Sequence, residues 1–135
     1  MTDAQTIASR FIEAVNARDF EMLARLVDED VAFDSLTGQR TIGVEPLRAW
    51  IMRYLRHFDE TFSDVVLMHD GFGQHVAADT TVHGTYRETM AGFPEASGQI
   101  YSIPSVFVFE IEDGAITRLS HYRNIRLFER ELAAG

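Results

Sequence analysis

Residues 99–125, QIYSIPSVFVFEIEDGAITRLSHYRNI, contain two apolar segments separated by Asp113-Gly114. Both segments are rich in β-branched and aromatic residues, which favour strands. Asp-Gly between such segments is a strong signal for the turn of a β-hairpin. The stretch therefore predicts two long antiparallel strands, at 99–111 and 115–125, joined by a tight turn.

The sequence before this hairpin predicts two more long strands and, further upstream, helices. Residues 62–69 and 75–86 have the same strand-like composition, and Asp70-Gly71-Phe72-Gly73 separates them. Helical periodicity is clearest at Leu47, Trp50, Ile51, Tyr54, Leu55 and Phe58. The expected elements are a helix at 3–17, a short helix after Asp19, a short strand at 31–34, a helix at about 44–58 and the four long strands.

This order of elements predicts an α+β fold of the type α-α-β-α-β-β-β-β. A long antiparallel sheet twists strongly, so it can curl around helices and leave a pocket between the two layers. We expect a curved antiparallel sheet wrapped around about three N-terminal helices. The length of 135 residues fits a single domain, 1–135, with one core.

The composition excludes several classes of function. A formal charge of −9 argues against nucleic-acid binding, which needs clustered cationic side chains. The absence of cysteine excludes disulfides and thiolate metal sites. No apolar run reaches the roughly 20 residues of a membrane span, and the N-terminus does not resemble a signal peptide. A cytoplasmic protein without membrane contact is expected.

One connection is unusually long. The stretch 83–104, HGTYRETMAGFPEASGQIYSIP, joins two strands through about a dozen residues, where two to five would close a hairpin. Its middle carries Met90, Phe93 and Pro94 rather than a polar run. Long loops of this kind are commonly parts of binding sites. The loop is therefore a candidate lid over the pocket.

Several stretches resemble a known superfamily. They are NARDFEMLARLVDEDVAFD at 16–34, HGTY at 83–86, GFPEASGQIY at 92–101, DGAITRL at 113–119 and HYRN at 121–124. Together with the order of elements, they resemble ketosteroid isomerase-related and SnoaL-like proteins of the nuclear transport factor 2-like superfamily, over nearly the whole chain. The resemblance implies a cone-shaped α+β fold. This scaffold carries isomerases, cyclases, epoxide hydrolases, dehydratases and non-catalytic binding modules, so function depends on the site.

The resemblance implies that Asp34 is the carboxylate that moves a proton. Counting from different ends of the chain places either Asp34 or Ser35 at this position. Val31 and Phe33 mark the inward face of the strand, which would turn Asp34 outward unless the strand ends or bulges there. A turn-capping role for Asp34 is the alternative.

His121 is the second candidate catalytic residue. An imidazole titrates near neutral pH and can give or accept a proton. By its spacing in HYRN, the residue lies where related cyclases and epoxide hydrolases carry an acidic group. Asp34 and His121 would form an acid/base pair if both entered the pocket. The alternative is a histidine at the surface or at a subunit contact.

The classical isomerase pattern is incomplete. Phe11 and Ser105 stand where the resemblance places the tyrosine and the protonated aspartate that hold the developing enolate. Phenylalanine has no hydrogen-bond donor and serine is a weaker, neutral one, so classical steroid isomerisation is not expected. The expected substrate-binding residues, for which plain core packing is the alternative, are Phe11, Trp50, Tyr54, Phe58, Val82, Met90, Phe93, Ser105 and Phe107.

These residues favour cofactor-independent acid/base chemistry of the isomerase, cyclase or dehydratase type on a small hydrophobic carbonyl compound. Two alternatives stay open, namely a non-catalytic, dimeric ligand-binding module and an epoxide hydrolase. No metal spacing or cofactor motif is recognisable, so no metal and no cofactor are expected. The resemblance implies a homodimer.

Overall fold

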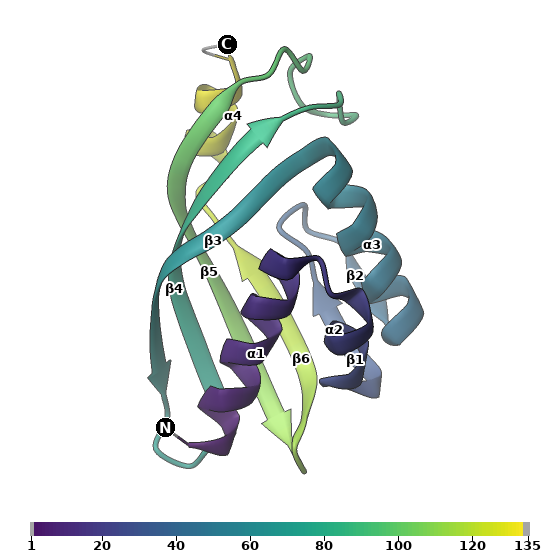
Figure 1. Cartoon of the computed structure of the whole chain (residues 1–135), viewed down its shortest axis with the longest axis vertical. Helices are drawn as coiled ribbons and strands as arrows, with labels where there is room; N and C mark the ends of the chain where they lie inside the picture. The colour runs from purple at the N-terminus through teal and green to yellow at the C-terminus, as the bar shows by residue number, and fades with distance from the viewer. Residues whose placement is uncertain (1, 134–135) are drawn as a thin grey trace.

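The computed structural model describes residues 2–133. Within them the chain forms four helices and six strands, arranged as a curved sheet with helices on its inner side (Figure 1). In chain order the elements are α1 (Asp3–Ala17), α2 (Phe20–Arg25), β1 (Val27–Asp34), β2 (Arg40–Ile42), α3 (Val44–His57), β3 (Phe58–His69), β4 (His75–Tyr86), β5 (Ile100–Glu112), β6 (Ala115–Tyr122) and α4 (Ile125–Ala133).

Local signals in the sequence fix where the helices begin. Thr2 and Gln5 form a reciprocal capping box at the start of α1, which satisfies two backbone N–H groups. Asp19 caps α2 by accepting from the Met22 N–H at 3.0 Å. Gly43, at φ 106°, supplies the turn into α3, a conformation that side chains disfavour. The expected helices are therefore confirmed.

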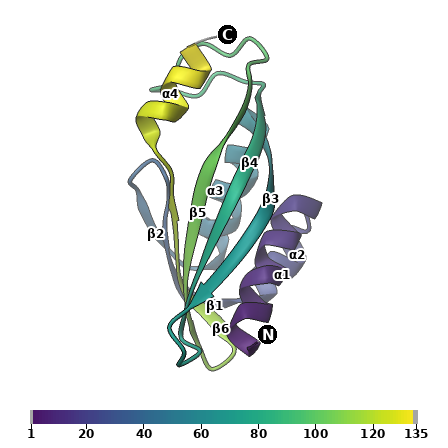
Figure 2. The ribbon, with the colours of Figure 1, turned by 90° about the vertical axis from the view of Figure 1, so that its left-hand side faces the viewer.

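The six strands form one open sheet in the order β2-β1-β6-β5-β4-β3. All neighbouring pairs are antiparallel except β1 and β6, which are parallel. The sheet is strongly twisted and curls around α1 and α3 to form the expected cone (Figure 2). A bulge between Ser63 and Val66 bends β3, with Asp64 at φ 51°.

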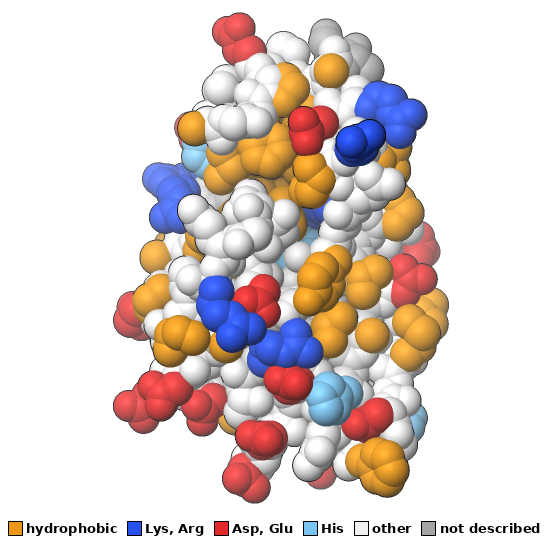
Figure 3. Space-filling model, turned by 180° about the vertical axis from the view of Figure 1, so that it is seen from behind, with side chains coloured by type: hydrophobic (Ala, Val, Ile, Leu, Met, Phe, Trp, Pro, Cys, Tyr) orange, Lys and Arg blue, Asp and Glu red, His pale blue; other side chains and the backbone are white. Residues whose placement is uncertain are grey.

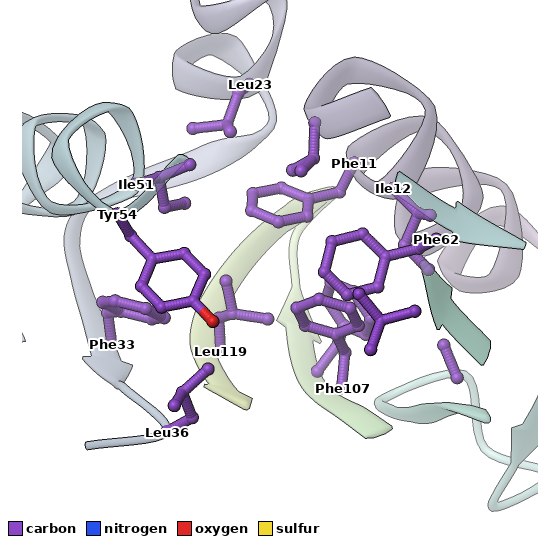
Figure 4. Packing of buried hydrophobic residues seen from close by; sticks show 14 of the residues in the cluster. Phe11, Ile12, Leu23, Phe33, Leu36, Ile51, Tyr54, Phe62, Phe107 and Leu119 are labelled. Carbon is purple, nitrogen blue, oxygen red and sulfur yellow. The ribbon is translucent and has the colours of Figure 1, made fainter. Parts of the chain in front are cut away.

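The inner face of the sheet and the helices share one apolar core. Burial alternates along β4 and β5, so that every second side chain points inward. Phe11 of α1 meets Phe109 of β5 edge to face, with ring centroids 5.7 Å apart. In Figure 4, Phe33 and Tyr54 face Phe62 and Phe107 across the middle of the cone, and the Tyr54 hydroxyl points into the space between them.

Several elements differ from the sequence expectation. The strands β1 and β3 begin at Val27 and Phe58, rather than at 31 and 62. The short strand β2 was not expected, because its three residues carry no periodic signal. The last strand ends at Tyr122 rather than at 125, and residues 125–133 form α4. Asn124 lies between the strand and this helix, which it caps by accepting from the Leu127 N–H at 3.1 Å.

The helix α4 covers the wide end of the cone. Its buried Phe128 packs against Phe58, Phe93 and Tyr101, with centroid distances of 5.2 to 5.6 Å. Figure 2 shows α4 across the end of the sheet, beside the long β4–β5 connection. None of the helices within residues 2–133 is long and apolar enough to cross a membrane.

The β4–β5 connection is held by side-chain hydrogen bonds. The Tyr86 hydroxyl accepts from the Met90 N–H at 2.9 Å and donates to the Pro94 carbonyl at 2.6 Å. The buried Gln99 amide donates to the carbonyls of Glu95 and of Leu132 in α4. The loop is thus anchored to both the sheet and α4.

Candidate functional site

A small cavity lies between the sheet and α3. Its volume is about 30 Å³, room for a water molecule or two. Its walls come from α1, α3 and four strands, and nearly all of them are apolar. The lining residues are Phe11, Val15, Phe33, Trp50, Ile51, Tyr54, Leu55, Glu60, Phe62, Phe107, Leu119 and His121.

Glu60 is a fully buried carboxylate at the cavity wall. It lies on the inward face of β3 between Phe58 and Phe62. Its Oε2 accepts hydrogen bonds from the hydroxyls of Tyr54, at 3.0 Å, and Tyr101, at 2.5 Å. Burial, followed by the charge of Glu60, raises the pKa of both phenols, so both stay protonated and donate.

Arg123 supplies the opposite charge. Its side chain is fully buried and binds Glu60 through both oxygens, at 2.8 Å and 3.0 Å. Burial alone would lower the pKa of Arg123, but the charge of Glu60 raises it overall. The guanidinium also lies 4.7 Å from the centre of the Phe128 ring. A bidentate pair of this kind is the arrangement in which a buried charge is compensated.

His121 borders the same cavity from β6. Its ring stacks on Phe107 with centroids 4.1 Å apart, and Nε2 lies 2.6 Å from the Ser105 hydroxyl oxygen. Burial, followed by the positive charge of Arg123, lowers the pKa of His121 well below its usual value. The imidazole is therefore neutral at physiological pH.

Glu60, Arg123, Ser105 and His121 form one connected network. Arg123 Nε donates to the Ser105 hydroxyl oxygen at 3.2 Å, while Arg123 Nη2 lies 3.4 Å from His121 Nε2. Ser105 is fully buried behind the imidazole and does not line the cavity. The network can hold a carboxylate and a neutral imidazole at one apolar cavity, which is a setting for proton transfer.

Asp34 lies on the opposite face of the sheet. Val31 and Phe33 point into the core, and Asp34 follows the alternation outward. Its carboxylate accepts from Arg40 at 2.6 Å and 2.9 Å, and from Ser120 at 2.8 Å. Hydrogen bonding from Arg40, opposed by partial burial, lowers the pKa of Asp34. Asp34 and His121 are therefore not brought together at the cavity.

Asp34 belongs to a polar row across the outer face of the sheet. Its links run from Asp70 to His75, Glu110, Arg118, Ser120, Asp34 and Arg40, each within 3.1 Å. Figure 3 shows positively and negatively charged side chains side by side over the lower middle of this face. Pairs of this kind at a surface contribute mainly to local order.

The remaining expected binding residues fall into three groups. Phe11, Trp50, Tyr54 and Phe107 line the cavity. Met90 and Phe93 line a separate open groove of about 590 Å³ at the wide end, whose wall also includes Trp50. Phe58 and Val82 are buried in the core and line neither space.

Comparison with known families gives the same architecture. The family model described as the SnoaL-like domain matches residues 8–119. This chain belongs to the SnoaL-like family. No curated protein sequence matches it.

Similar solved structures include two proposed polyketide cyclases. One, from Xanthomonas campestris pv. campestris, is 32% identical over 96% of each chain, with a TM-score of 0.91. The other, from Pseudomonas putida, is 32% identical over 98% of each chain, also with a TM-score of 0.91. An epoxide hydrolase of the LEH-like type from M. tuberculosis shares the fold at 17% identity, with 98% of this chain and 91% of that chain covered and a TM-score of 0.77. The SnoaL-like fold therefore accommodates several different activities.

Two central residues of this SnoaL-like site were missed by the sequence analysis. Glu60 interrupts an inward-facing row whose neighbours, Phe58 and Phe62, are apolar, and a charged residue in such a row is a signal of a buried functional group. Arg123 lies in the HYRN stretch, two residues after His121, and so on the same inward side. Within the described part of the chain, no cluster of His, Asp and Glu side chains is arranged to hold a metal ion.

Proposed function

We propose that this SnoaL-like protein is a cofactor-independent enzyme that moves a proton on a small apolar carbonyl compound, as isomerases, cyclases and dehydratases do. One observation supports this most strongly. The Glu60 carboxylate and the neutral His121 imidazole border the same otherwise apolar cavity. A carboxylate that can accept a proton and an imidazole that can donate a hydrogen bond, both within reach of one substrate, are a usual basis of acid/base chemistry.

In this proposal His121 is the hydrogen-bond donor. Because Ser105 accepts from Arg123, its own hydroxyl proton is free to go to His121 Nε2. That assignment leaves the imidazole proton on Nδ1, for which no residue between 2 and 133 provides a hydrogen-bond partner. A neutral Nδ1–H can donate to a carbonyl oxygen and stabilise the negative charge that develops there when a proton is removed.

Glu60 is the proton acceptor. Its Oε2 accepts three hydrogen bonds, from Tyr54, Tyr101 and Arg123, whereas Oε1 accepts only from Arg123 among the described residues. Oε1 therefore keeps a lone pair for a substrate proton. Arg123 compensates the charge of the carboxylate before the reaction, and apolar walls exclude bulk water from it.

Proton transfer can be tested before the natural substrate is known. A panel of cyclic and aryl ketones is incubated with the protein in D₂O, and exchange of the protons next to the carbonyl is followed by NMR. We expect exchange to be accelerated for at least one ketone. Glu60→Gln should lower this rate by about 10²–10⁴-fold, the range for removal of a general base.

The matched control is Asp34→Asn, the same change of carboxylate to amide on the other face of the sheet. Its rate should stay within about twofold of the wild type. Since Glu60→Gln also removes the counter-charge of Arg123, circular dichroism must show a folded variant. His121→Gln leaves the ion pair intact and should lower the rate by roughly 10²-fold through loss of the donor. Full activity in both Glu60→Gln and His121→Gln would reject the proposal.

A ligand-binding module is the second candidate, favoured by the three hydrogen bonds that already engage Glu60 Oε2. It predicts that a bound ketone raises the melting temperature yet keeps its protons in D₂O. The NMR experiment separates the two functions directly, because exchange requires chemistry and binding does not.

A further inference from the structure

The cavity and the open groove are neighbouring compartments with one residue in common. The inner cavity is about 30 Å³ and apolar apart from the Glu60 and His121 groups, whereas the outer groove is about 590 Å³. Trp50 is the only residue that lines both of them within the described part of the chain. A ligand larger than a few atoms cannot fit into the inner cavity alone, so part of it must leave the cavity. It can leave past Trp50 into the outer groove, or past Leu55, which also lines a hollow of about 600 Å³ between α2 and α3.

Trp50 is held only by aromatic contacts. Its ring stacks on Tyr54, with an interplanar angle of 9° and centroids 5.0 Å apart, and meets Phe33 edge to face at 5.3 Å. No hydrogen bond joins its indole to any residue from 2 to 133. Displacing the ring breaks no hydrogen bond to these residues, but it costs the aromatic contacts. Trp50 is therefore the one residue of the described chain past which a ligand could extend from the inner cavity into the outer groove.

The outer groove has a polar side that the inner cavity lacks. Arg53, one turn after Trp50 on α3, lines it and forms no ion pair with the rest of the described chain. His57 follows on the same helix, and its Nδ1 lies 2.9 Å from the Glu88 carbonyl oxygen. Across the groove, Glu129 of α4 is the one carboxylate in the lining. The apolar part of the groove comes from Leu36, Met90, Phe93 and Ile125.

We propose that the ligand of this site is an elongated apolar carboxylate that occupies both compartments. Its apolar, reacting end lies beside Glu60 and His121, its chain passes Trp50, and its carboxylate is held by Arg53 in the outer groove. The inference rests on the proposed function in one respect: the inner cavity is taken as the place where the reacting end of the ligand lies. Arg53 and Trp50 are then the residues that select the substrate by charge and by length.

The test uses ω-phenylalkanoates of increasing chain length and the matched ω-phenylalkanols, which differ only in the charged end. Isothermal titration calorimetry gives the Kd of each. We expect phenylpentanoate and phenylheptanoate to bind about threefold to fivefold more tightly than the corresponding alcohols, as an exposed ion pair allows. The preference should disappear in Arg53→Gln and shrink in high salt.

Two control variants each remove one charge, a positive charge in Arg56→Gln and a negative charge in Glu129→Gln. Arg56→Gln removes a guanidinium from the same helix. Arg56 lines only the hollow between α2 and α3, whereas Arg53 lines both that hollow and the outer groove, so this variant should keep the preference. Glu129→Gln removes the carboxylate across the groove and should increase the preference for the acid over the alcohol. Equal binding of acid and alcohol by the wild type would overturn the inference. So would loss of the preference in Arg56→Gln alone, because the chain would then leave the cavity past Leu55.

Occupation of the inner cavity needs its own test. Val15→Phe fills that cavity and should abolish binding of the long acids, and the milder Val15→Ile should weaken it by a smaller factor. Undiminished binding in a folded Val15 variant would place the ligand in the outer groove alone and reject a ligand that spans both. Trp50 is the only tryptophan, so its emission should change as the wild type binds.

These outcomes are independent of turnover. A carboxylate preference without ketone exchange would support the two-compartment site and reject the proposed chemistry. Exchange on neutral ketones without any carboxylate preference would support the proposed chemistry and reject the two-compartment site.

Discussion

The Ser105 hydroxyl oxygen lies 2.6 Å from Nε2 of His121, and the same oxygen accepts from Arg123 at 3.2 Å. Arg123 Nη2 lies 3.4 Å from the same Nε2, and because a guanidinium can only donate, Nε2 is assigned as the acceptor in both contacts. Ser105 therefore donates to His121, and the imidazole proton is on Nδ1. Nitrogen NMR should find this tautomer, and no imidazolium, from pH 6 to pH 8.

The neutral state of His121 has a consequence for stability. Its pKa is lowered in the folded protein, while in the unfolded chain it returns to about 6.5, so the unfolded state binds the proton first. The contribution of neutral His121 to the free energy of unfolding is fully present above pH 6.5 and is lost as the pH falls below that value. We expect the free energy of unfolding to fall by about 1.4 kcal/mol per pH unit in this window.

Urea unfolding at pH 7, 6 and 5 measures this slope, and His121→Gln should remove most of it. His75 acts in the opposite direction. Hydrogen bonds that His75 donates to Asp70 and then to Glu110 raise its pKa. Its stabilising contribution is therefore fully present below pH 6.5 and is lost as the pH rises through the raised value. A wild-type slope that His121→Gln leaves unchanged would contradict a buried neutral imidazole.

The Glu60–Arg123 pair should show strong non-additivity. Arg123→Met leaves a buried carboxylate without its counter-charge, and we expect a loss of about 3–5 kcal/mol in the free energy of unfolding. The double variant Glu60→Leu/Arg123→Met removes both charges and should be more stable than Arg123→Met alone. If the double variant loses the sum of the two single losses, the pair is not coupled.

Gly84 is expected to act through Tyr101. A Cβ at position 84 would lie 2.2 Å from the Tyr101 ring, so Gly84→Ala must displace the ring and weaken its hydrogen bond to Glu60. Overpacking of this kind costs about 1–3 kcal/mol. The cost should be much smaller when Tyr101 is also changed to Ala, since the ring is then absent. Thermal unfolding of the four proteins in this cycle provides the test.

Asp34→Asn should have little effect on the free energy of unfolding. Its carboxylate is 28% exposed and paired with Arg40 on the outer face, where such pairs contribute less than about 1 kcal/mol. Because the pKa of Asp34 is lowered in the folded state, this small contribution is lost only as the pH falls through and below about 3.8. A loss well above 1 kcal/mol at pH 7 would show that the polar row is a structural element in its own right.

The anchoring of the β4–β5 connection can be tested at Tyr86. Tyr86→Phe removes the hydroxyl that bonds to Met90 and Pro94 while keeping the ring stacked on Phe58. Hydrogen exchange of the loop amides should then become faster, with the sheet unaffected. Equal exchange in both proteins would mean that Gln99 and packing alone hold the loop.

Much of the architecture was predictable because it rests on periodicity and turn residues. The strands at 75–86 and 99–111, the Asp113-Gly114 turn and the short helix after Asp19 rest on local signals, and each is confirmed. The position of β1 is different. It pairs in parallel with β6, nearly ninety positions away at Asp34 and Ser120, and local sequence does not encode such a partner.

The candidate site was less predictable for a related physical reason. The role of Glu60 depends on Arg123, which is distant in sequence and becomes its partner only in the fold. The resemblance to ketosteroid isomerase implied that Asp34 is the catalytic carboxylate. The alternation of Val31 and Phe33 instead predicted that the Asp34 side chain points outward. At this strand the period-two pattern was the better guide to orientation.

The position of α4 in the chain bears on biosynthesis. Phe128 covers Phe58, Phe93 and Tyr101, and the ribosome makes all three before it makes Phe128. A nascent chain therefore exposes this aromatic surface until α4 has left the exit tunnel. During that interval the open end of the cone is a natural binding site for a chaperone, and a translation stall between Tyr101 and Phe128 would leave the nascent chain prone to aggregation.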